Sequence, residues 1–325
     1  MRIWRCCVTP RRFAGRCTSG YIPFMSTPQN HTLRAGLYMV LCTGSFVCGD
    51  SFIKIIGNTL PVGEIMAILG LLSCIFLLII CAQQGILQNA PMIFSRSVLL
   101  RSIVDLIAGF MFISALMNMP IANVAAIMQS VPLVVVVVAI IFLGEKGGVK
   151  RAAAVVAGFL GVMLVVKPAP QTVSIYQFLA LATVLMVALR DIVTKKIPPH
   201  VPLLIVALAN AVFAATGGLA FGLLQGFRVL ETWHLFVLVG AGVFITFGYI
   251  LLVATVRLGD LSATAPFRYA EVLFAIVSGI LVFNEYPDLL SYFGMALIIA
   301  AGLYAAHQET TRSHDAKVEL MPPVL

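Results

Sequence analysis

The chain has 325 residues, of which 61% are hydrophobic and 10% are charged, whereas a soluble globular protein has about 45–50% and about 25%. The mean hydropathy is +1.04 over the whole length, which excludes a disordered chain and an ordinary soluble domain. The composition predicts an all-α polytopic membrane protein that lies in the lipid bilayer.

A basic leader, residues 1–32, comes first. It contains five arginines and no acidic residue, a composition shared with organellar transit peptides. Met25 begins a short polar stretch before the first apolar segment, so an alternative is that translation starts there and residues 1–24 are not part of the protein.

Apolar segments of about 20 residues follow, and each is long enough to cross the ~30 Å hydrocarbon core as a helix. Ten such spans are predicted, at residues 33–56, 61–83, 98–117, 121–143, 150–167, 174–195, 201–224, 233–256, 261–283 and 289–306. Continuous apolar runs favour helices over the alternating pattern of a β-barrel. A polar tail, residues 307–325, ends the chain.

Charged residues inside the first span are candidate gate or coupling groups, because an ionisable group in a bilayer usually faces the bundle interior. Asp50 and Lys54 are four residues apart and share a helix face. On the third span Arg101 and Asp105 repeat this spacing. The alternative is that Lys54 and the acids only reach toward the nearest membrane interface.

The sixth and seventh spans carry further candidates. Arg190 and Asp191 lie near the inner end of the sixth span and join the gate or coupling group. Gly218, Gly222 and Gly226 on the seventh span are spaced for close helix packing, either internally or in a homodimer.

The ninth span carries a charged pair near the membrane midplane. Arg268 and Glu271 are three residues apart, and Glu271 lies roughly 15 Å along the helix. With the neighbouring Tyr269 they are the leading candidates for substrate binding. The alternative is a structural salt bridge between Arg268 and Glu271.

Aromatic side chains on several spans are candidates for stacking on a planar substrate. Tyr249 and Phe112 are chosen as substrate-binding residues from a set that comprises Phe46, Phe112, Phe244, Tyr249, Phe267 and Tyr269.

The basic residues predict the orientation of the chain. Of the 21 Lys and Arg residues, 15 fall on the side that holds both termini, which the positive-inside rule assigns to the cytoplasm. This bias accounts for the net charge of +8, so we expect no nucleic-acid partner.

Two halves of the chain align with each other at a shift of 140–141 residues. At 141, Asp50 matches Asp191 and Lys54 matches Lys195; at 140, Glu145 matches Glu285. Residues 33–167 and 174–306 therefore form two predicted repeats of five helices each. An odd number of spans inverts the second repeat, as in many secondary transporters.

The repeats resemble the EamA repeats of the drug/metabolite transporter superfamily. In each half one helix ends in an acid, as in Phe-Leu-Gly-Glu at 142–145 and Val-Phe-Asn-Glu at 282–285, and a Gly/Ala-rich helix follows. The run 265–269 together with 281–285 is similar to the bacterial branch that contains riboflavin transporters.

The resemblance implies a secondary transporter of a small organic metabolite that works by alternating access in the bacterial inner membrane, with riboflavin uptake as the expected activity. Alternatives are an importer or exporter of amino acids, S-adenosylmethionine-like metabolites or drugs, and, more remotely, an intramembrane enzyme that modifies lipid. The sequence has no Walker A motif, and its five histidines fall in loops, tails or helix ends and form no cluster inside the spans, so we expect no ATPase site, no metal, no cofactor and no enzymatic activity.

Overall fold

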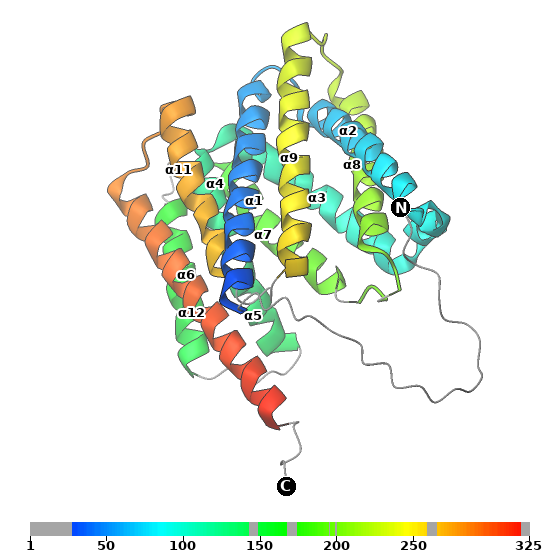
Figure 1. Cartoon of the computed structure of the whole chain (residues 1–325). Coiled ribbons are helices and arrows are strands. Elements are labelled where there is room, and N and C mark those ends of the chain that lie inside the picture. The colour runs from blue at the N-terminus through cyan, green and yellow to red at the C-terminus, as the bar shows by residue number, and fades with distance from the viewer. Residues whose placement is uncertain are drawn as a thin grey trace, which may run out of the picture.

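The computed structural model describes residues 28–142, 149–167, 174–194, 196–198, 200–258 and 265–319. The regular structure within these ranges is entirely helical (Figure 1). Predicted features that involve Glu145, Lys195 or the leader before residue 28 lie outside the described residues.

The helices follow the predicted spans closely. In the first half they are α1 (Pro28–Ile56), α2 (Val62–Gln83), the 3-10 helix η1 (Ile86–Phe94), α3 (Arg96–Asn118), α4 (Ile121–Met128), α5 (Val131–Phe142) and α6 (Val149–Val166). In the second half they are α7 (Ile175–Thr194), α8 (Leu203–Gln225), α9 (Thr232–Leu258), η2 (Ala265–Tyr269), α11 (Ala270–Phe283) and α12 (Leu289–Glu319).

Seven of these helices are long and apolar enough to cross a membrane, and three shorter apolar helices lie within residues 121–135, 153–166 and 289–304. Their outer faces carry large apolar side chains that water does not favour. Phe236 is 75% exposed and Leu281 is 76% exposed. Such surfaces suit contact with lipid rather than with water.

The predicted span at 121–143 is broken in the middle. α4 ends at Met128 and α5 begins at Val131, with Gln129 and Ser130 between them. Pro132 is the physical cause, because it has no N–H to donate to the carbonyl one turn earlier and its ring crowds that carbonyl. The Ser130 hydroxyl donates to the Ile127 carbonyl over 2.6 Å and satisfies one of the carbonyls at the break.

The other departures from the predicted elements occur near segment ends. The described part of the 261–283 span begins as the 3-10 turn η2, with Pro266 in its first turn, before α11 starts at Ala270. The predicted connection after α2 contains η1, and α12 continues to Glu319 instead of ending at residue 306. The tail up to Glu319 has no Pro or Gly that would stop the helix.

The helices pack in a small set of pairs. α1 lies between α9 and α11, α3 packs along α7, α2 packs along α8, and α6 packs along α12. Figure 1 shows the α6–α12 pair on one side of α1 and the α2–α8 pair on the other. The centre of the bundle is therefore formed by α1, α3, α7, α9 and the broken helices.

Close approach between α2 and α8 depends on glycine. A Cβ atom at Gly218 would meet the backbone of Ala67, and one at Gly70 would meet the backbone of Ala215. Gly222 is likewise against Gly63 of α2. Of the two predicted roles for the glycine series, internal packing is therefore the one that Gly218 and Gly222 serve, and Gly226 instead ends α8 at a φ of 80°.

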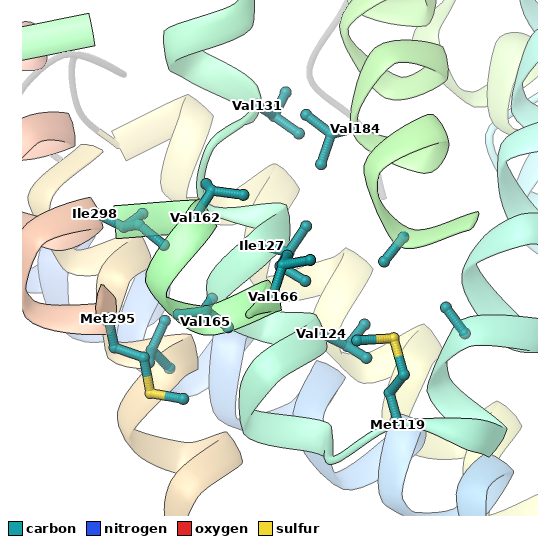
Figure 2. Close-up of a cluster of buried hydrophobic side chains, with 14 of the residues drawn as sticks. Met119, Val124, Ile127, Val131, Val162, Val165, Val166, Val184, Met295 and Ile298 are labelled. Atoms are coloured by element: carbon teal, nitrogen blue, oxygen red, sulfur yellow. The ribbon is translucent and has the colours of Figure 1, made fainter. Parts of the chain in front are cut away.

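Buried aliphatic side chains fill the space between α4, α5, α6, α7 and α12. Val124 and Ile127 of α4 meet Val162 and Val166 of α6, and Ile298 joins them from α12 (Figure 2). A second cluster, which includes Val47, joins α1, α2, α3, α9 and α11. These clusters hold the helices that position the polar groups described next.

Candidate functional site

A charged network crosslinks α3, α7 and α8 within the bundle. Arg190 of α7 donates from Nη1 to Asp105 Oδ1 of α3 over 2.9 Å and from Nη2 to Asp191 Oδ1 over 2.9 Å. The second Asp105 oxygen accepts from the Asn210 amide of α8 at 2.6 Å. The structure thus brings together three of the predicted gate or coupling residues and adds Asn210.

Arg101 extends this network by one turn. Its Nε donates to the Thr194 hydroxyl over 2.9 Å, while its Nη1 is buried without a hydrogen-bond partner. Asp105 and Arg190 keep 22% and 28% of their side-chain surface accessible. These groups are therefore paired but still open to a small polar molecule.

Aromatic groups from α1 and α9 adjoin the network. The Tyr249 ring meets the Phe46 ring edge-on at a centroid distance of 5.2 Å. Tyr249 lies within electrostatic range of Asp105, Arg190, Arg101 and Asp50, yet 55% of its surface is accessible.

The other aromatic candidates serve packing to different degrees. Phe244 stacks on Phe52 at 5.7 Å. Phe112 is half-buried and packs against both aliphatic clusters. Phe267 lies against Gly36 of α1.

Glu271 lies at the start of α11, beside the break in the α4–α5 helix. Gln129 Nε2 donates to Glu271 Oε2 over 3.0 Å and to the Arg268 carbonyl over 3.2 Å. The Arg268 side chain is exposed and forms no ion pair with Glu271. The partner of Glu271 is therefore Gln129, which was not among the predicted site residues.

A sequence signal for Gln129 was present in the repeat alignment. At a shift of 140 residues Gln129 matches Tyr269, and both residues lie at the point where a helix is interrupted. The predicted site residue Tyr269 is buried and its hydroxyl is directed at Gly302 of α12. Tyr269 thus lies on the α12 side of the broken helix, apart from Tyr249.

Asp50 and Glu271 are two acids that form no salt bridge among the described residues, although the charge of Arg268 acts on Glu271. Asp50 is half-buried on α1 and lies within electrostatic range of Glu271. Ser51 directly follows Asp50, and its hydroxyl shares a hydrogen bond of 2.6 Å with that of Ser278, seven residues after Glu271, between α1 and α11. Two neighbouring carboxyl groups in a bundle interior favour a positively charged group between them.

Lys54 and Glu285 close one end of the bundle. Lys54 Nζ is 2.6 Å from Glu285 Oε1 and also donates to the Met119 carbonyl. Glu285 Oε2 accepts from the Ile121 N–H over 2.9 Å. An open hollow of about 520 Å³ lies outside this pair, lined in part by Asn118.

A second ion pair lies at the ends of α6 and α12. Lys167 contacts Asp288, whose Oδ1 also accepts from the Ser291 hydroxyl over 2.7 Å. These hydrogen bonds, with that from Lys167 the larger cause, hold the pKa of Asp288 at about 2. A carboxylate with a depressed pKa stays ionised until the pH falls toward that value, so Asp288 stays ionised in the physiological range.

No three His, Cys, Asp or Glu side chains gather closely enough to hold a metal ion in the part of the chain that the structure describes.

Comparison with protein families gives a match to the EamA-like transporter family. The family model matches twice, at residues 33–167 and 174–305. Together the two matches cover most of the chain.

Named relatives include transporters of different metabolites. The chain is 27% identical to an S-adenosylmethionine uptake transporter of Rickettsia bellii over 194 residues, which are 58% of this chain and 65% of that protein. The matched segment thus spans just under two thirds of the relative. A riboflavin transporter of Brucella anthropi is 26% identical over 213 residues, 63% of this chain and 74% of that protein.

A third relative matches over a longer stretch. The pseudopaline exporter of Pseudomonas aeruginosa is 24% identical over 285 residues, 83% of this chain and 95% of that protein. A solved crystal structure superposes with a TM-score of 0.58 at 17% identity and covers 87% of this chain and 98% of that chain. This last likeness concerns the fold alone.

Proposed function

The chain belongs to the EamA-like transporter family of the drug/metabolite transporter superfamily, and from this premise we propose that it is a secondary transporter that moves a small organic metabolite across the bacterial inner membrane by alternating access. Family membership makes the protein a multi-pass membrane transporter rather than an enzyme. The substrate, the number of spans and their orientation belong to the proposal.

We assign the chain ten spans in two inverted five-helix repeats. The family model matches each half once. In the repeat alignment α1 corresponds to α7, and α3 corresponds to α9. Exchange of the two halves therefore turns the α1–α9 contact into an α7–α3 contact, and the structure contains both contacts. The α2–α8 and α6–α12 pairs each map onto themselves. This exchange supports a two-fold axis in the membrane plane, the arrangement on which alternating access depends.

The two broken helices add to this support. The break after Met128 and the η2–α11 junction at Tyr269 are separated by the same 140-residue shift that aligns the halves. Transporters often place their substrate site at discontinuous helices near the midplane, where backbone groups are free of helical hydrogen bonds. Gln129 and Glu271 lie at these breaks.

The substrate proposed here carries both a positive charge and a carboxylate, as S-adenosylmethionine does. The observation that carries this assignment is the pair of acids Asp50 and Glu271, neither of which forms a salt bridge among the described residues, with Glu271 held by the neutral Gln129 amide. These acids suit an ammonium or sulfonium group, and the unpartnered Nη1 of Arg101 suits a carboxylate. Tyr249 with Phe46 offers rings on which a purine can stack.

Riboflavin is the second candidate. The accessible Tyr249 ring suits an isoalloxazine, and the carboxylates and Asn210 suit the ribityl hydroxyls. The riboflavin transporter of Brucella anthropi matches a similar share of this chain. Riboflavin is uncharged, however, and brings no positive charge to Asp50 and Glu271.

Uptake by cells that express the protein tests both candidates. We expect accumulation of radiolabelled S-adenosylmethionine above cells with an empty vector, and competition by the unlabelled compound but not by riboflavin. Asp50→Asn is expected to abolish this uptake at an unchanged membrane level, while Asp288→Asn, outside the bundle interior, is expected to retain it. Accumulation of riboflavin alone would replace the first candidate by the second, and accumulation of neither would refute both.

A further inference from the structure

The Lys54–Glu285 pair joins three parts of the molecule at one end of the site. Lys54 belongs to α1, Glu285 follows α11, and both bind the backbone of the α3–α4 connection at Met119 and Ile121. Lys54 also lies over the Phe283 ring at 5.2 Å. Both charges are therefore satisfied by groups on different helices.

The surroundings of Glu285 fix its position on α11. Asn284 adopts the left-handed conformation with φ of 52°, and the Glu285 N–H donates to the Gly279 carbonyl over 2.9 Å. This C-terminal turn directs the carboxylate back toward α1. An asparagine accepts that conformation at lower cost than most other residues with a side chain.

Separation of α1 from α11 leaves both charges without partners. The Lys54 and Glu285 side chains are 9% and 22% accessible, so water does not compensate them fully in the closed arrangement. Breaking a pair of this kind is unfavourable unless new counter-charges replace the lost ones. Below the pair, the Ser51–Ser278 hydrogen bond crosses between the two helices.

The hollow outside the pair can supply those counter-charges from a ligand. Lys54 and Glu285 themselves line it, together with the amide side chains of Asn58 and Asn118. A molecule that carries a carboxylate and a cation, such as the amino acid group of S-adenosylmethionine, matches the charges of Lys54 and Glu285 respectively. A neutral molecule of the same size matches neither.

We propose that Lys54 and Glu285 form a gate that a zwitterionic substrate opens by exchange, its carboxylate binding Lys54 and its cationic group binding Glu285 in the hollow. The proposal rests on the proposed transport function and adds a site of first contact on the outer side of the Asp50–Glu271 couple. A ligand shifts a conformational equilibrium only through a difference in affinity for the two states. Here the difference in affinity between the closed and open states arises because the ligand can bind Lys54 and Glu285 in place of their mutual ion pair only when the gate is open.

Thiol labelling below the gate tests this inference independently of transport. Ser278→Cys is placed in a background without native cysteines, and a membrane-impermeant maleimide is added from the side of the gate. We expect slow labelling alone and at least about threefold faster labelling with S-adenosylmethionine. Lys54→Met with Glu285→Gln is expected to give fast labelling that S-adenosylmethionine no longer changes.

The single variants and a matched control complete the test. Lys54→Met or Glu285→Gln alone leaves one unpaired charge, and we expect lower transport than in the double variant. The matched control is Lys167→Met with Asp288→Asn, which removes the ion pair between the ends of α6 and α12. This control is expected to leave the labelling rate unchanged. Slow labelling in the Lys54–Glu285 double variant would overturn the gate. If the parent with Ser278→Cys were labelled at the same rate with and without S-adenosylmethionine, the control of the gate by substrate would be overturned. Ligand-dependent labelling without net uptake would instead preserve the gate and reject the transport function.

Discussion

Glu271 shows how a single side chain acquires its surroundings from distant parts of the chain. Arg268, three residues earlier, is exposed and forms no ion pair with Glu271. The hydrogen-bond partner of Glu271 is Gln129, 142 positions earlier. Gln129 is only 4% exposed, and its amide spans two interrupted helices. A carboxyl group held by a neutral amide rather than by an ion pair can still bind a cationic ligand.

Glu271→Gln is therefore expected to reduce transport at least about tenfold, because a hydrogen bond or ion contact to a charged group contributes about 1.5–3 kcal/mol. The measurement is the initial uptake rate against substrate concentration, normalised to the protein present in the membrane. Glu231→Gln serves as the control, since Glu231 is exposed before α9 and bonds Trp233. Normal uptake by Glu271→Gln would remove Glu271 from the binding site.

Arg190 holds two acids that would otherwise repel each other. Removing its charge by Arg190→Gln leaves Asp105 and Asp191 uncompensated, and because both retain solvent contact the expected cost is about 1–3 kcal/mol. We expect lower thermal stability in detergent, partly restored by adding Asp105→Asn. Arg228→Gln, which loses only a bond to the Thr59 carbonyl, is the control. Additive losses in the double variant would contradict the coupling of Arg190 with Asp105.

The sequence was sufficient to select the interior charges but not their partners. An ionisable residue in an apolar segment is costly wherever it lies, so Asp50, Asp105 and Arg190 stood out from composition alone. Their pairing depends on how helices pack, and three residues of spacing did not bring Arg268 to Glu271. Asn210 and Gln129 are uncharged, and nothing local to them indicated that they would bind acids.

At the scale of the helices, small residues determine how closely α2 and α8 approach. A side chain at Gly218 would meet the backbone nitrogen of Ala67, and backbone atoms cannot move aside as a flexible side chain can. The same holds for Gly70 against Ala215. These contacts explain why a GxxxG pattern is used inside this molecule.

Gly218→Leu is expected to lower the free energy of unfolding by about 1–3 kcal/mol, as overpacking typically does. The melting temperature in detergent, with aggregation followed by size exclusion, provides the measurement. Leu219→Met is the matched control, because Leu219 is the next residue on α8 and is 51% exposed. A melting temperature for Gly218→Leu equal to that of the control would show that α2 and α8 separate without cost.

Apolar length predicted where most helices run, because the bilayer sets a minimum span. It did not predict the interruption at Gln129 and Ser130. Pro132 lies in a run of valines that reads as one continuous span, and a proline in a membrane helix is often tolerated. Whether the helix kinks or breaks depends on its surroundings, and here the Ser130 N–H and hydroxyl both donate to the Ile127 carbonyl at the break.

At the scale of the whole molecule, two halves of similar sequence produce a site that neither half contains alone. Asp50, Lys54 and Gln129 come from the first half, whereas Glu271, Glu285 and Tyr249 come from the second. The broken helices of the two halves differ in charge, because Glu271 of the second half matches the apolar Val131 of the first. The repeat thus supplies the frame, and the differences between its copies supply the chemistry.

The proposed opposite orientation of the two halves leads to the last prediction, ten spans with both termini in the cytoplasm. Five spans in the first half carry residue 33 and residue 174 to opposite sides, and the second half returns the chain to its starting side. The excess of basic residues fixes that side as cytoplasmic. Reporter fusions measure the outcome: phosphatase fused after Pro170 is expected to be active in the periplasm, and fused after Pro199 to be inactive.

Fluorescent-protein fusions at the same positions are expected to give the converse pattern, because such proteins fluoresce only when they fold in the cytoplasm. A third fusion after Pro287 separates orientation from span number. It is expected to behave like the Pro170 fusion, since the Lys54–Glu285 pair places the end of α11 beside the end of α1. The reverse result at all three sites would mean that the orientation is opposite to the predicted one, with the two repeats unaffected. Different results at Pro170 and Pro287 would contradict the ten-span arrangement itself.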